Sequence, residues 1–105
     1  MSARLVMTPD LTGLLDVLTA GIDAVVATRG PLSVRDASFL ARAHLHQLGV
    51  TDMTVSLDAL AEAARARARL DGAISSRAVA GAMLAALAGQ DAALRAAAQR
   101  ARGAI

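Results

Sequence analysis

The side chains that could perform chemistry are few in this sequence, and their spacing is not that of a catalytic or metal site. Cysteine is absent, and the two histidines, His44 and His46, are two residues apart. Residues two apart on a helix point in different directions, so the pair lacks the spacing of metal ligands. Because His44 falls within an apolar stripe, we expect its ring to be buried and hydrogen-bonded.

The acidic and hydroxyl side chains do not form a recognisable catalytic group either. Asp16 and Asp23 lie two helical turns apart on a polar face, where solvation accounts for both carboxylates. The sequence contains no glycine-rich phosphate loop and no local Ser-His-Asp arrangement. It therefore predicts a protein that is not an enzyme and that binds no metal and no cofactor.

Arginine is the side chain most able to recognise a partner, and its distribution is uneven. Residues 1–64 contain four arginines and seven acidic residues, a net charge of −3, whereas residues 65–105 contain seven arginines and two acidic residues, a net charge of +5. A basic half can bind nucleic acid, which is the alternative function that this sequence suggests. The arginines that would contact phosphates are Arg65, Arg67, Arg69, Arg77, Arg95, Arg100 and Arg102.

Two features give a simpler explanation of these arginines. Asp58, Glu62, Arg65 and Arg69 are three or four residues apart on one helix flank, which is the spacing of a solvated salt-bridge face. The chain also has 27 alanines and no lysine, a composition typical of GC-rich coding DNA, which raises the arginine content without a functional cause.

Helix-start signals and apolar periodicity indicate the elements that must position these side chains. Ser33, Ser56 and Ser75 are predicted N-caps, and Gly30 and Gly49 are predicted to follow helix ends. No run alternates apolar and polar residues for long enough to predict a strand. The predicted helices span residues 8–28, 33–48, 56–70, 75–89 and 91–102. We therefore expect an all-α fold, a compact bundle of four to five short helices that forms a single domain over residues 1–105.

The first predicted helix is apolar enough to raise the question of a membrane span. Its apolar stretch, residues 11–26, carries Asp16 and Asp23, whereas a membrane helix needs about 20 predominantly apolar residues with almost no charge. No secretory leader is recognisable, and without cysteine there is no disulfide framework. We therefore expect a cytoplasmic protein that does not bind a membrane.

The second predicted helix has apolar residues on two sides. Its main stripe includes Leu40 and Leu45, whereas Phe39, the one aromatic residue of the chain, lies on another side. We therefore expect this helix to contact neighbours on both sides. The strip formed by Arg35, Phe39, Arg42 and His46 is a candidate contact surface.

Residues 74–83, Ile-Ser-Ser-Arg-Ala-Val-Ala-Gly-Ala-Met, resemble the second helix of the helix-turn-helix family, in which a serine cap and a buried valine are common. The resemblance implies a DNA-binding transcriptional regulator. The preceding predicted helix is, however, about two turns too long for the tight turn of that family. The face left for DNA, which consists of Arg77, Gly81, Leu84 and Ala88, has one hydrogen-bonding side chain, too few to read base edges.

A helix that lacks polar residues on either side is normally covered by another element. Gly81 and Ala85 would let a neighbouring backbone approach closely, so we expect the fifth helix or the same helix of a second subunit to cover this face. The favoured prediction is therefore a helical protein interaction, assembly or regulatory module that binds a protein partner and self-associates. Its predicted partner surface consists of Arg77, Gly81, Leu84, Ala85, Ala88 and Leu94.

Overall fold

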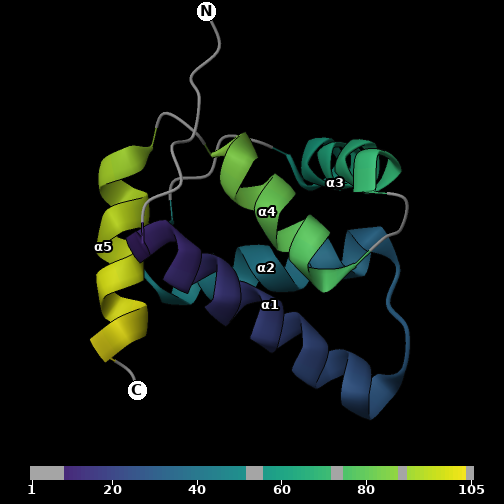
Figure 1. Cartoon of the computed structure of the whole chain (residues 1–105), viewed down its shortest axis with the longest axis horizontal. Helices are drawn as coiled ribbons and strands as arrows, with labels where there is room; N and C mark the ends of the chain where they lie inside the picture. The colour runs from purple at the N-terminus through teal and green to yellow at the C-terminus, as the bar shows by residue number, and fades with distance from the viewer. Residues whose placement is uncertain (1–8, 52–55, 72–74, 88–89, 104–105) are drawn as a thin grey trace, which may run out of the picture.

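Five helices follow one another in the computed structural model, which describes residues 9–51, 56–71, 75–87 and 90–103 (Figure 1). The helices are α1 (Pro9–Arg29), α2 (Val34–Gln47), α3 (Leu57–Asp71), α4 (Ser76–Ala86) and α5 (Asp91–Gly103). The described ranges contain no strand, so the all-α prediction is confirmed. The helix ends lie within one residue of the predicted ends, except that α4 ends at Ala86 instead of residue 89.

The predicted signals at the helix ends act as expected. The side-chain oxygens of Ser33, Ser56 and Ser75 each accept a hydrogen bond from the backbone N–H three residues later, at 3.1–3.2 Å. These bonds satisfy amide groups that have no partner within the first helical turn. Gly30 and Gly49 follow α1 and α2 with φ angles of +88° and +98°, a conformation that residues with a Cβ rarely adopt.

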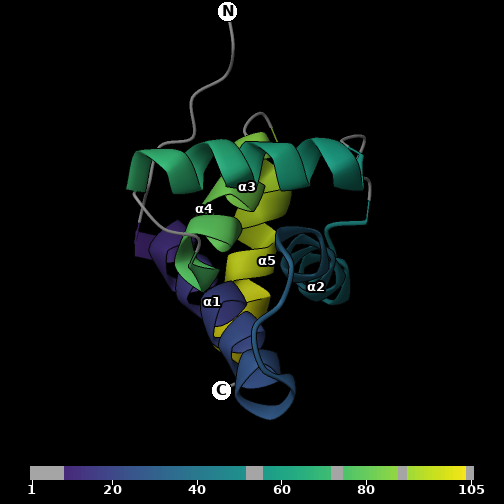
Figure 2. The same ribbon diagram turned by 90° about the vertical axis from the view of Figure 1, so that its right-hand side faces the viewer.

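Helix α4 lies at the centre of the arrangement. It packs against α1, α2 and α3, while α5 packs against α1 (Figure 1). Figure 2 shows α3 lying across α4 on one side, with α1 and α2 on the other. The helices that cover α4 within the chain are thus α1, α2 and α3 instead of the expected α5, and cover by a second subunit stays a prediction.

Helix α1 contributes the longest apolar stripe of the core. Its segment Leu11–Arg29 has a mean hydropathy of 1.5 and is, by length and composition alone, long enough and apolar enough to cross a membrane. The core helix of a globular protein passes the same test. In this bundle Leu14, Leu18 and Ile22 are at most 1% exposed and pack into the common core.

Candidate interaction surfaces

The outer side of α4 is narrower than the sequence suggested. Leu84 and Leu94 were predicted to belong to a partner surface, but both are fully buried in the core of the single chain. The helical periodicity assigned Leu84 to the outside because it assumed that α4 has one packed stripe. Helix α4 is instead packed on three sides, which brings Leu84 into the core along with Val79 and Met83.

Three of the predicted partner residues do remain at the surface of α4. Arg77 and Ala85 are exposed, and a Cβ added at Gly81 would meet no atom within 4 Å. Ala88 lies outside the described residues. The open part of α4 is therefore a single strip one residue wide.

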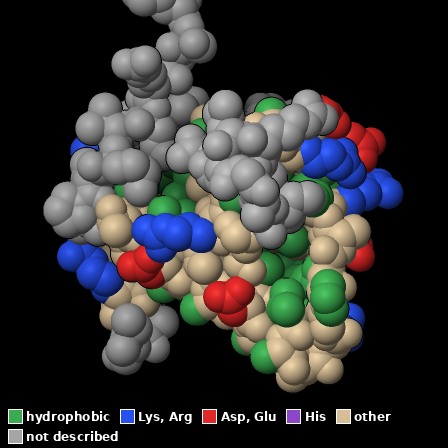
Figure 3. Space-filling view, turned by 45° about the vertical axis from the view of Figure 1, so that its right-hand side comes forward, with side chains coloured by type: hydrophobic (Ala, Val, Ile, Leu, Met, Phe, Trp, Pro, Cys, Tyr) green, Lys and Arg blue, Asp and Glu red, His purple; other side chains and the backbone are tan. Residues whose placement is uncertain are grey.

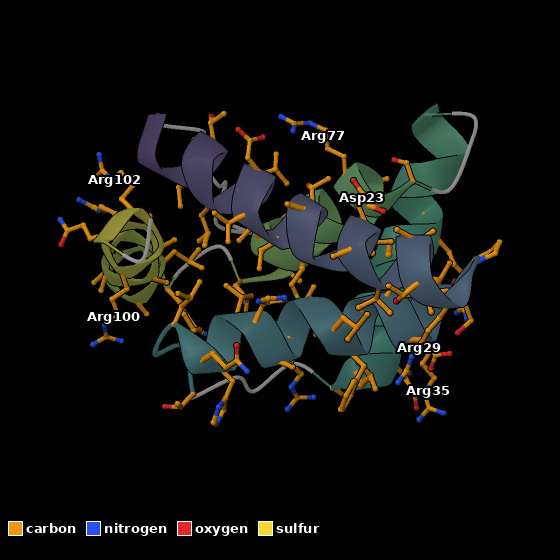
Figure 4. The ribbon with its side chains drawn as sticks, turned by 90° about the horizontal axis from the view of Figure 1, so that it is seen from below. Asp23, Arg29, Arg35, Arg77, Arg100 and Arg102 are labelled. Carbon is orange, nitrogen blue, oxygen red and sulfur yellow. The ribbon has the colours of Figure 1, made fainter. Side chains whose placement is uncertain are left out.

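Polar contacts join α1 to the start of α4 beside this strip. The Arg77 guanidinium lies 2.7 Å from the Asp16 carboxylate, and the Ser76 hydroxyl donates a hydrogen bond of 2.5 Å to Asp23. Figure 4 shows Asp23 and Arg77 on the same side of α1. Asp16 and Asp23 were expected to be accounted for by solvation alone, yet both have partners 53 or more residues away in the sequence. We call these four residues the α1–α4 face.

A hollow of about 380 Å³ adjoins the α1–α4 face. Its lining is mainly apolar and comes from α1, the α1–α2 connection, α2 and the start of α4. Those lining residues are Ile22, Asp23, Val26, Pro31, Leu32, Val34, Ala37, Ser75, Ser76 and Val79. Figure 3 shows hydrophobic side chains gathered at the C-terminal end of α1. Asp23 and Ser76, two of the polar residues that line this hollow, bond to each other.

A second hollow, of about 340 Å³, lies on the outer side of α2. Phe39 is 59% exposed at its edge and is the exposed large hydrophobic residue of the described chain. Helix α2 contacts α1, α3 and α4, but no described helix covers its second apolar side, which carries Phe39; a neighbour on that side therefore stays a prediction. We call the lining of this hollow the Phe39 surface, which consists of Phe39, Arg42, Ala43, His46, Gln47 and Thr51.

The Phe39 surface contains most of the strip that the sequence suggested. Phe39, Arg42 and His46 line the hollow together, as their spacing of three and four residues on one helix predicts. Arg35 belongs to the same strip but pairs with Asp58 of α3 at 3.3 Å. No ion pair of Arg42 is found among the described residues, where its side chain is half-buried beside Phe39.

The carboxyl end of α2 meets α5 next to this surface. Arg100 donates a hydrogen bond of 2.8 Å to the carbonyl oxygen of Leu48. Its guanidinium lies so close to Gly49 that a Cβ there would collide with it. A cation at this position complements the partial negative charge at the end of a helix. The sequence pattern gave no sign of this contact, because the residues are 52 positions apart.

His44 occupies a different environment from the one expected. It is half-buried, and its ring packs so tightly on α1 that a Cβ at Gly21 would collide with Nε2. The glycine therefore provides the space for the ring, a role that the sequence pattern did not reveal. The described residues contain no group of three or more potential metal ligands.

The arginines proposed to contact phosphates do not share one face. Arg65 pairs with Glu62 at 3.2 Å, as the salt-bridge interpretation predicted, whereas Arg95 is exposed on α5. Figure 4 shows Arg100 and Arg102 on opposite sides of α5, with Arg77 on another part of the molecule. The side chains of Arg67 and Arg69 lie outside the described part of the chain.

Comparisons with family models, with curated proteins and with solved structures find no match to this chain.

Proposed function

We propose that this protein is a non-enzymatic interaction module that binds a protein partner through the Phe39 surface. The observation that carries the proposal is the exposure of Phe39. A chain with one aromatic residue places it, 59% exposed, at the edge of a hollow and not in the core. Aromatic and arginine side chains are enriched where proteins bind one another, because they bury large areas and donate directional hydrogen bonds.

The composition of the surface supports a protein partner. Phe39 and Ala43 offer apolar area, and Gln47 and Thr51 offer neutral hydrogen-bonding groups around it. Such a mixture, an apolar centre with a polar rim, is the usual anatomy of a protein interface. The core side of α2 is occupied by its own bundle, so the Phe39 side is the one available for a partner.

The same contacts weigh against the nucleic-acid alternative. Reading bases requires a helix whose outer face carries several donors or acceptors, whereas α4 is surrounded by three helices. Arg77 lies in the open strip of α4 and forms an ion pair with Asp16. Salt-dependent binding to a short DNA duplex remains the measurement that would favour that alternative.

Photo-crosslinking in the source cell tests the proposal and compares the two surfaces. Benzoylphenylalanine replaces Phe39 in one variant and Ala20, an exposed residue on the same side of α1 as Asp16 and Asp23, in the other. The probe at position 39 retains an aromatic ring, so it should form a defined adduct with a partner protein. The probe at position 20 should not.

Each result has a definite meaning. Adducts from position 20 alone would move the interface to the α1–α4 face and overturn the surface that we assign. An adduct of twice the mass of the chain from position 39 would identify the partner as a second copy. Absence of adducts from both positions would count against an interaction module.

A further inference from the structure

The Phe39 surface carries positive charge in the part that the structure describes. Its lining there includes Arg42 and His46 and no acidic side chain. Arg35, the other arginine of the strip on α2, already forms an ion pair with Asp58. Arg42 therefore presents a cationic group that lacks an ion-pair partner among the described residues, next to exposed apolar area.

Arg100 extends this cationic character to the end of α2. The last carbonyl groups of a helix carry partial negative charge, which would repel an anionic partner. Arg100 bonds to the carbonyl oxygen of Leu48 and lies across Gly49, so this negative end is compensated. Thr51, which also lines the hollow, lies two residues after Gly49.

The spacing along α2 sets the size of what can bind. Phe39 and His46 are seven residues apart, which corresponds to about 10 Å along a helix at 1.5 Å per residue. Arg42 and Ala43 lie between them. A short segment with one apolar side chain and flanking charges covers this distance.

We infer that the Phe39 surface binds an acidic segment of a partner protein. An apolar side chain of that segment packs on Phe39 and Ala43, its carboxylates pair with Arg42, and one of them accepts a hydrogen bond from a ring N–H of His46. Arginine suits this role because its planar guanidinium can hold a carboxylate through two parallel hydrogen bonds. This inference rests on the proposed function and specifies the chemistry of the partner.

A second copy of the chain fits this surface less well. In a two-fold symmetric dimer the same patch lies on both sides of the interface. Both copies of Arg42 would then lie within one interface, whose described lining supplies no acidic side chain to pair with them, and like charges oppose binding. Complementary charge thus favours a different, acidic protein.

Selection of short random peptides displayed on phage tests the inference. The full chain serves as the target, and each round is depleted against Phe39→Ser so that only peptides using this surface remain. We expect the surviving peptides to be enriched in Asp and Glu around an apolar residue. The same selection on Arg42→Glu should lose the acidic enrichment.

Titration of one selected peptide then measures how much Arg42 contributes to the affinity. Reversal of charge at Arg42 should weaken binding by roughly tenfold, because an attraction becomes a repulsion. Arg95→Glu is the matched control: it makes the same change at an exposed site on α5 and should leave the affinity unchanged. Circular dichroism of each variant verifies that the fold is retained.

The outcomes separate the inference from the proposed function. Phe39-dependent peptides without acidic enrichment would overturn the inference and leave the interaction module standing. A selection that yields no Phe39-dependent peptide would overturn both. Tighter, Arg42-dependent binding to phosphatidylglycerol vesicles or to a short DNA duplex than to the selected peptide would replace the acidic protein with a lipid or nucleic-acid partner.

Discussion

The α1–α4 face and the Phe39 surface use similar side chains in opposite ways. On the α1–α4 face, Arg77 pairs with Asp16 and Ser76 donates to Asp23, so the polar groups hold two helices of the same chain together. On the Phe39 surface, Arg42 lies beside an exposed aromatic ring without an ion pair in the described chain. An arginine on an amphipathic helix is therefore informative about binding only after its contacts within the chain are known.

The difference follows from what packs around each helix. Helix α4 is covered by three helices, so its few polar residues lie where α1 passes and can reach its acidic side chains. Helix α2 also packs against three helices, α1, α3 and α4, but its side with Phe39 stays open. The two regions therefore differ in which side of a helix is covered, and substitutions in each region can test that difference.

The largest expected effect is the contrast between Leu84 and Phe39. Leu84→Ala should lower the free energy of unfolding by about 2–5 kcal/mol, because it leaves a cavity at a fully buried position in α4. Phe39→Ala should change it by no more than about 0.5 kcal/mol, since that ring is mostly exposed. Urea unfolding followed by circular dichroism measures both values.

Equal destabilisation by the two substitutions would mean that Phe39 serves the fold and would remove the reason for placing an interface on α2. Loss of binding to a phage-selected peptide with unchanged stability is the combination expected for Phe39→Ala.

The second prediction concerns the end of α2. Gly49→Ala should cost about 1–2 kcal/mol, which is the penalty for a Cβ at positive φ. A smaller additional cost should come from the displacement of the flexible Arg100 guanidinium and the loss of its hydrogen bond to Leu48. In an Arg100→Ala background the collision disappears and only the backbone penalty remains. Comparison of the four proteins by urea unfolding separates the two contributions. Identical costs in both backgrounds would show that Arg100 does not rest on Gly49.

Most of the architecture could be predicted from the sequence because its signals are local. The serine caps and the glycines after α1 and α2 act within a few residues, and they placed the helices almost to the residue. Apolar periodicity likewise identified the buried stripe of α1, which includes Leu14 and Leu18.

What could not be predicted depends on which helices meet. Leu84 is buried because three helices pack around α4, and the apolar periodicity of one helix does not reveal how many helices pack against it. The pairing of Arg77 with Asp16 and the bond from Arg100 to Leu48 join residues more than 50 positions apart. The strip with Phe39 was recognisable from spacing on α2, but the exposure of Phe39 depends on how the described helices pack and could not be read from that spacing.

The third prediction addresses the open strip of α4. Gly81→Ala should raise the free energy of unfolding by about 0.5–1 kcal/mol, because alanine favours a helix and the added Cβ meets no neighbour. Gly13→Ala in α1 is the matched control, since a Cβ there also meets no atom within 4 Å. Urea unfolding should show stabilisation in both variants.

Gly81→Leu extends this prediction to self-association. If two copies approach closely at the strip, the leucine should reduce the mass measured by light scattering while the chain stays folded. An unchanged mass, with adducts still formed from position 39, would leave the Phe39 surface as the interface.

Arg77 and Arg42 should differ slightly in their contributions to stability. Arg77 and Asp16 are both more than half exposed, so their coupling in a double-mutant cycle should be about 0.2–1 kcal/mol and should decrease with salt. Arg42→Ala should leave the free energy of unfolding nearly unchanged, because no ion pair of Arg42 is found among the described residues. A cost for Arg42→Ala that exceeds the Arg77 coupling would reveal a stabilising contact within the chain. In that case the cation would already be committed to the fold, and the acidic partner would lose its main binding group.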